Sequence, residues 1–132
     1  MAGAGKTYTA ALGISGGNPG GSPLVESFNG TSWTEIADVN AGRDYGAGTG
    51  TTTSALFFGG EPSLTSTELW NGTNWTEQAD LSPPSGFLAI AGAGTATSAI
   101  AFGGEGPSNE MRTATEEWLG AGSPLTKTVN TD

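Results

Sequence analysis

An internal repeat runs through the whole length of the sequence and restricts the folds that it can adopt. A segment of small and aliphatic residues ending in a glycine pair occurs three times: TYTAALGISGG at 7–17, TTTSALFFGG at 51–60 and TATSAIAFGG at 95–104. Repeats of roughly 44 residues indicate that one small structural unit is used several times. We therefore predict a single repeat domain over residues 1–132, with units at about 1–43, 44–87 and 88–132.

A second repeated segment follows each glycine pair. VESFNGTSWTEIAD at 25–38 matches TELWNGTNWTEQAD at 67–80, and TEEWLGAGSPLTKT at 115–128 is an altered third copy. Short runs of strand-forming residues, separated by Gly, Pro and Asn signals, are typical of an all-β protein. Each unit is expected to hold four strands. In the second unit these are residues 45–50, 54–58, 66–70 and 74–78.

The link between the third and fourth strands contains Asn-Gly, at 29–30 and 71–72. Asn-Gly favours a two-residue type I′ turn, which would place Trp70 opposite Thr73. A four-residue loop would instead place Trp70 opposite Trp75. In both registers the aromatic residues share one face, which a neighbouring unit would have to cover. We interpret five aromatic residues as packing between units, with a sugar-stacking platform as the alternative: Phe28, Trp33, Trp70, Trp75 and Trp118.

These residues carry a resemblance to a known family. An aliphatic strand ending in Gly-Gly, an aromatic residue on the third strand and a Trp on the fourth form the signature of kelch repeats. It reads ALFFGG…LWNGTNW in the second unit and ALGISGG…SFNGTSW in the first, and Arg43 stands where kelch repeats often carry an arginine. The chain thus resembles the kelch family over its whole length. The resemblance implies a β-propeller of four-stranded blades.

Two departures accompany the resemblance. The paired aromatic residues are closer together than in most kelch repeats, and Leu125 stands where the third unit should have a Trp. The NGTxWTE hairpins are similar to those of kelch-like proteins of marine phage and environmental sequences. That similarity implies a virion or extracellular setting.

Three blades are too few for a closed propeller, since propellers typically contain about four to eight. A half-turn gap would expose a sheet face at either end, and large exposed apolar patches mark interfaces. Two copies arranged head to tail would form a six-bladed ring with two equivalent junctions. We therefore predict a homodimer. A nine-bladed ring of three chains and a fragment of a longer propeller are the alternatives.

Composition restricts the chemistry that the chain can perform. Thirteen acidic and four basic residues give a net charge of −9, and there is no His and no Cys. An acidic protein repels phosphate backbones, so we expect no nucleic-acid partner. Without His or Cys, the Ser-His-Asp and Cys-His mechanisms and most zinc sites are excluded. We predict no catalytic residue, metal or cofactor, and hence no enzyme; a signal peptide and a membrane span are not expected either.

The candidate binding residues lie in the predicted loops that vary between units. In a four-stranded meander, the loop between strands two and three and the link to the next unit emerge at the same edge. Variable loops on a rigid scaffold are the usual place for recognition. The predicted ligand-binding residues at this edge are Arg43, Asp44, Tyr45, Asn109, Glu110 and Arg112.

The expected function is a non-enzymatic binding module whose ligand is a surface glycan or a protein. The alternative is a structural virion or appendage subunit, which forms rings and binds no small ligand.

Overall fold

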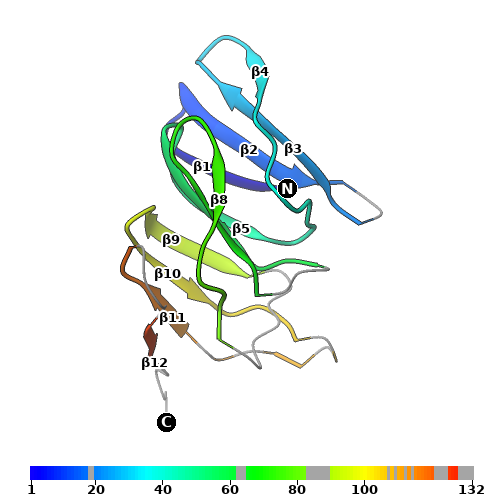
Figure 1. Cartoon of the computed structure of the whole chain (residues 1–132), viewed down its shortest axis with the longest axis vertical. Helices are drawn as coiled ribbons and strands as arrows, with labels where there is room; N and C mark the ends of the chain where they lie inside the picture. Colours follow the sequence, from blue (N-terminus) through cyan, green and yellow to red (C-terminus); the bar gives the residue numbers. More distant parts are fainter. Residues whose placement is uncertain are drawn as a thin grey trace.

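The computed structural model describes residues 1–17, 20–61, 65–82, 90–106, 108, 110–111, 113, 115–120 and the backbone of 125–127. Every regular element in these ranges is a β-strand, and none is a helix. The strands form three antiparallel four-stranded sheets, each built from four consecutive strands (Figure 1). The prediction of an all-β chain with three four-stranded units is therefore confirmed.

The strands fall into three groups along the chain. The first sheet contains β1 (Ala2–Thr7), β2 (Ala10–Gly16), β3 (Ser22–Phe28) and β4 (Trp33–Ile36). The second contains β5 (Ala47–Thr51), β6 (Ser54–Phe58), β7 (Thr67–Trp70) and β8 (Trp75–Glu77). The third contains β9 (Ala91–Thr95), β10 (Ser98–Phe102), β11 (Thr115–Trp118) and β12 (Leu125–Lys127). Each sheet lies within one of the three units expected from the repeat.

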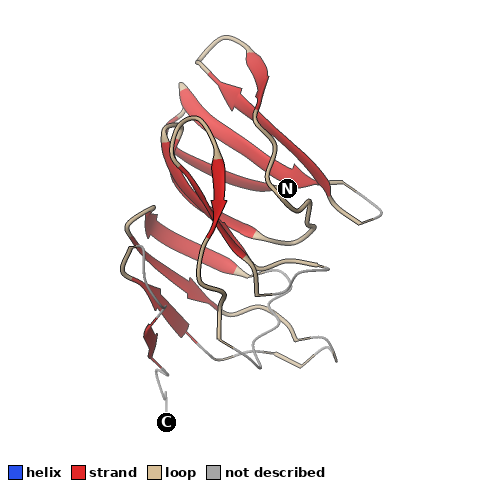
Figure 2. Ribbon diagram, in the orientation of Figure 1, coloured by secondary structure: helices blue, strands red, loops and turns tan. Residues whose placement is uncertain are grey.

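The sheets approach one another most closely along their first strands. β1 lies against β5, and β5 lies against β9 (Figure 2). Glycine permits this approach, because a Cβ at Gly48 would lie only 2.8 Å from the carbonyl oxygen of Gly3. The hydroxyl of Thr49 donates a hydrogen bond to the carbonyl oxygen of Gly94 on β9, at 2.7 Å. Sheets that converge on their first strands have a propeller-like arrangement, although three sheets alone do not close a ring.

Each junction between neighbouring sheets is filled by one apolar layer. The layer at the first junction includes Leu12, Ile14, Val25, Ala55, Phe57, Trp70 and Trp75. The layer at the second junction includes Leu56, Leu69, Phe58, Ala99, Ala101 and Trp118. Alternate residues of a strand point to opposite faces, so β6 supplies Phe57 to one layer and Phe58 to the other. The middle sheet therefore buries both of its faces.

In the part of the chain that the structure describes, each outer sheet has one face that no other sheet covers. Trp33, on the free face of the first sheet, is 52% exposed, whereas its counterpart Trp75 is 5% exposed in the first junction. Phe28 lies beside Trp33 and is only half-buried. The expected packing role of these two residues would thus need a covering sheet from outside the chain. On the free face of the third sheet, Ile100 and Phe102 are exposed.

The hairpin between the third and fourth strands has the four-residue register. Trp70 pairs directly with Trp75, with ring centroids 5.3 Å apart, and the first sheet has the same register. The two-residue type I′ register is wrong. The side-chain oxygen of Asn71 accepts the main-chain N–H groups of Thr73 and Asn74, at 2.9 and 2.8 Å. An asparagine side chain that imitates a backbone turn in this way closes the longer loop.

Candidate functional site

The structure separates the residues that were predicted to bind a ligand. The Arg43 side chain is buried, with 1% of its surface exposed, whereas Tyr45 is 59% exposed. Asp44 lies between them, half-buried, and Glu110 is exposed. Asn109 and Arg112 lie outside the described residues. Tyr45 is thus placed where a ligand could reach it, and Arg43 is not.

The guanidinium group of Arg43 lies inside the first junction. Its Nη1 is 3.3 Å from Glu68 Oε1, an ion pair without hydrogen-bond geometry. Its Cζ lies 4.3 Å from the centre of the Phe57 ring, and Nη2 donates to the Phe57 carbonyl oxygen at 3.4 Å. Burial lowers the pKa of Arg43 because desolvation penalises the charged form, while Glu68, Glu77 and Asp80 act in the opposite direction. Arginine nevertheless stays protonated in proteins.

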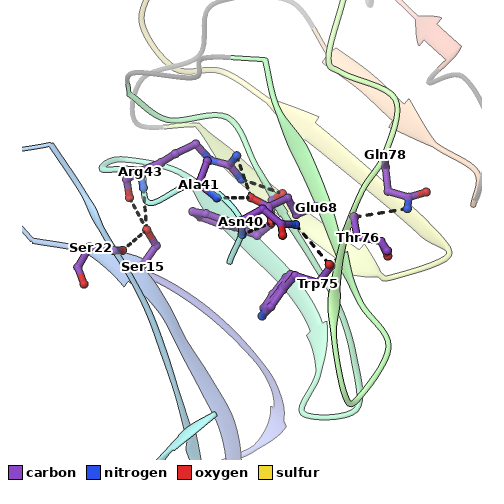
Figure 3. A network of polar contacts seen from close by, with 10 residues as sticks. Ser15, Ser22, Asn40, Ala41, Arg43, Glu68, Trp75, Thr76 and Gln78 are labelled. Carbon is purple, nitrogen blue, oxygen red and sulfur yellow. Dashed lines mark hydrogen bonds and ion pairs between the residues drawn. The ribbon is translucent and has the colours of Figure 1, made fainter. Parts of the chain in front are cut away.

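The carboxylate of Glu68 also holds the segment that connects β4 to β5. Its Oε2 accepts hydrogen bonds from the main-chain N–H and the side-chain amide of Asn40, at 2.7 and 2.9 Å (Figure 3). Its Oε1 accepts the main-chain N–H of Ala41 at 3.3 Å. Hydrogen bonds to an ionised acceptor are stronger than those between neutral groups. Glu68 therefore fixes the connecting segment to the second sheet.

Ser15 fixes the same segment to the first sheet. The main-chain N–H of Arg43 donates to Ser15 Oγ at 2.8 Å. The Ser15 hydroxyl lies 2.9 Å from the carbonyl oxygen of Arg43 and 2.7 Å from that of Ser22, so it can donate to either (Figure 3). A Cβ at Gly21 would lie 2.5 Å from the main chain of Arg43. The loop between β2 and β3 is therefore in direct contact with the segment between β4 and β5.

Tyr45 follows this anchored segment and has an unusual backbone conformation. Its φ is 60°, in the left-handed region that few residues other than glycine adopt. Asp44 and Glu61 exchange two main-chain hydrogen bonds beside it, at 3.0 and 2.8 Å. Such conformations persist where the surroundings enforce them, and they are concentrated at functional sites. We call this surface, formed by Asp44, Tyr45 and Glu61, the Tyr45 edge.

Three further residues build this site although they are not among the predicted ligand-binding residues: Ser15, Glu61 and Glu68. Glu68 had a signal, because Glu26 and Glu116 stand at the matching place two residues before the aromatic residue of β3 and β11. Ser15 lies in β2 and is the one extra residue of the first copy, ALGISGG against ALFFGG, whereas Glu61 follows the glycine pair as Glu105 does in the third unit. Their roles depend on contacts between segments that are distant in the sequence.

The described residues provide neither a metal-binding cluster nor a membrane-spanning helix. Among the described residues, no group of three or more His, Cys, Asp or Glu side chains is arranged to hold a metal ion. No helix in the same residues is long and apolar enough to cross a membrane. The Tyr45 edge offers an exposed aromatic ring and the carboxylates of Asp44 and Glu61, whose main chains pair next to Tyr45.

The fold places the chain among all-β proteins with repeated four-stranded sheets in a propeller-like arrangement. No family model and no curated protein matches the sequence. Among solved structures, the chain is similar to that of YjhT, with a TM-score of 0.76 and 20% sequence identity. The match covers 96% of this chain and 44% of YjhT, so the chain spans less than half of that protein. At this identity the likeness concerns the fold alone.

Proposed function

We propose that this chain is a non-enzymatic binding module, a β-propeller of the kelch type that recognises a glycan or a protein through the Tyr45 edge. The observation that carries the proposal is the exposed tyrosine held in the left-handed conformation. Tyrosine offers a large amphipathic surface and has only two side-chain torsions to fix on binding. The nearby carboxylates of Asp44 and Glu61 can accept hydrogen bonds from sugar hydroxyls or from peptide N–H groups.

The contacts behind the Tyr45 edge support the same proposal. Ser15 and Glu68 hold the preceding segment on two different sheets, and the pair of main-chain hydrogen bonds to Glu61 fixes the residue before Tyr45. A surface that is already rigid loses little conformational freedom when a ligand binds, which favours affinity. The buried Arg43 therefore contributes to recognition indirectly, through the position of the loop.

A glycan array tests this function, with a matched pair of tyrosine variants. Tyr8 is also exposed, but it follows the first strand of its sheet, in the turn between β1 and β2, whereas Tyr45 precedes the first strand of its sheet, β5. We expect wild-type protein and Tyr8→Ala to bind the same glycans, and Tyr45→Ala to lose that binding. Pull-down from a surface extract with the same three proteins covers the case of a protein ligand. Equal binding by Tyr45→Ala and Tyr8→Ala in both assays would reject the Tyr45 edge as the site.

We also propose that two chains complete a six-bladed ring. The uncovered faces of the first and third sheets support this, because they carry Trp33 on one side and Ile100 and Phe102 on the other. The matching residues are packed against a neighbouring sheet at the two junctions within the chain. A head-to-tail pair would cover both free faces at two equivalent junctions.

The same free faces favour a second candidate, a structural ring-forming subunit of a virion or appendage that has no small ligand. Stacked or attached rings in electron micrographs, together with a blank glycan array, would favour this candidate over the binding module.

A further inference from the structure

One glutamate recurs at the same register position in all three sheets. The glutamate shares a sheet face with the aromatic residues of the hairpin that follows it. Its partner on the second strand of the sheet is the third residue of the motif ALG, ALF or AIA. The pairs are Glu26 with Gly13, Glu68 with Phe57, and Glu116 with Ala101. Because the register is identical, any contact that two of these glutamates share is a property of the repeat.

Both junctions within the chain use this glutamate in the same way. Glu68 accepts the main-chain N–H of Asn40, which leaves the first sheet, at 2.7 Å. Glu116 accepts the main-chain N–H of Ser82, which leaves the second sheet, at 3.0 and 2.9 Å to its two oxygens. Asn40 and Ser82 occupy equivalent positions, because each is the second residue after one of the matching segments 25–38 and 67–80. In each junction, therefore, a carboxylate on one sheet anchors the backbone of the segment arriving from the sheet before it.

Glu26 occupies this position on the face of the first sheet that none of the described strands covers. Its side chain is exposed, with Glu35 opposite it on β4. A hollow of about 240 Å³ lies beside the two carboxylates and is also lined by Gly13. At the corresponding place in the second sheet, the Arg43 side chain comes from the segment that follows the first sheet, forms an ion pair with Glu68 and lies over the Phe57 ring, a position that Gly13 holds in the first sheet. The hollow is thus where a segment from a preceding sheet would sit.

We infer that Glu26 is the docking carboxylate of the seam between two chains, an inference that rests on the proposed ring. Glu26 accepts main-chain N–H groups from a second copy, whose third sheet covers this face. Ile100 and Phe102 of that copy then pack over Phe28 and Trp33. The two-fold arrangement gives the second copy the same contact at the other seam.

Charge favours main-chain N–H groups as the partners of Glu26. The chain has a net charge of −9 and only four basic residues, so two copies bring together far more acidic than basic side chains. A carboxylate that is buried without donors is costly, whereas main-chain amides satisfy it without a basic side chain. The contact therefore selects one register of the covering sheet, since a shifted register would leave Glu26 desolvated and unsatisfied.

Sedimentation equilibrium on three full-length proteins tests the inference: wild type, Glu26→Gln and Glu35→Gln. Glu35 is the matched control, because it lies on the same face and its counterpart Glu77 stays exposed at the first junction. We expect the wild type to be a dimer. Loss of charge-assisted hydrogen bonds should raise the dimer dissociation constant of Glu26→Gln by about tenfold or more. Glu35→Gln should remain close to the wild type.

The outcomes separate the inference from the proposed ring. A wild-type dimer whose dissociation constant changes equally in Glu26→Gln and Glu35→Gln overturns the role of Glu26 and leaves the ring intact. A wild type that is monomeric at every concentration overturns both. Because Glu26 is exposed in the single chain, circular dichroism of Glu26→Gln should match the wild type, so a weaker dimer reports on the seam and not on folding.

Discussion

Arg43 illustrates how far the role of a single residue depends on contacts that a sequence does not reveal. The repeat places Arg43 in a loop, and a charged residue in a loop is expected at the surface. Its side chain instead enters the first junction, because Glu68 and the Phe57 ring on the next sheet offer a counter-charge and an aromatic face. Tyr45, two residues later, remains exposed. The edge that carries the candidate site could be predicted, but which of its side chains point outward could not.

Removal of Arg43 should strongly destabilise the chain. Arg43→Ala leaves Glu68 buried without its cation, and breaking a buried pair in this way costs about 3–5 kcal/mol. The main-chain donors of Asn40 and Ala41 remain, so we expect the free energy of unfolding to fall by about 3 kcal/mol. Urea unfolding followed by tryptophan fluorescence measures it. Lys6→Ala, at an exposed cation, is the control, with an expected change within about 0.5 kcal/mol. Similar losses in both variants would mean that the buried pair contributes little.

At the scale of the elements, the repeat predicts most of the architecture. The strand expected at 54–58 is β6, and the other three strands of the second unit were placed within two residues of their observed ends. The hairpin register was ambiguous, because Asn-Gly suits both a two-residue turn and a longer loop. The side chain of Asn71 decides it by accepting two main-chain N–H groups. Local sequence thus indicates strands and turns, whereas register depends on which hydrogen bonds the turn residues form.

The close approach of the first strands, β1 and β5, leads to a prediction about glycine at position 48. Gly48→Ala would place a Cβ 2.8 Å from the carbonyl oxygen of Gly3, a main-chain atom that cannot move alone. Overpacking of this kind costs about 1–3 kcal/mol, so we expect a lower midpoint of thermal unfolding. Gly3→Ala is the matched control, since its Cβ would lie 3.6 Å from the nearest carbonyl oxygen. If Gly3→Ala is destabilised as much as Gly48→Ala, the close approach of β1 and β5 is not what requires glycine.

At the scale of the whole molecule, the three sheets differ in how much of their surface they bury. The middle sheet is covered on both faces, and the first and third sheets on one each. The exposed side chains on the two free faces occupy the positions that form the junctions inside the chain. The repeat predicts that a sheet face at either end of the chain needs a covering sheet, and the covering sheet itself stays a prediction. The ligand could not be predicted in the same way, because the loops of the Tyr45 edge differ from unit to unit.

The mass of the native assembly is the decisive measurement for the ring of two chains. Native mass spectrometry of the wild-type chain at micromolar concentration should give a dimer, at twice the 13.1 kDa of the single chain. A ring of two chains requires this result, since three four-stranded sheets supply only half of the six blades. A stable monomer at 13.1 kDa across the accessible concentrations would contradict the ring, and with it the docking role of Glu26.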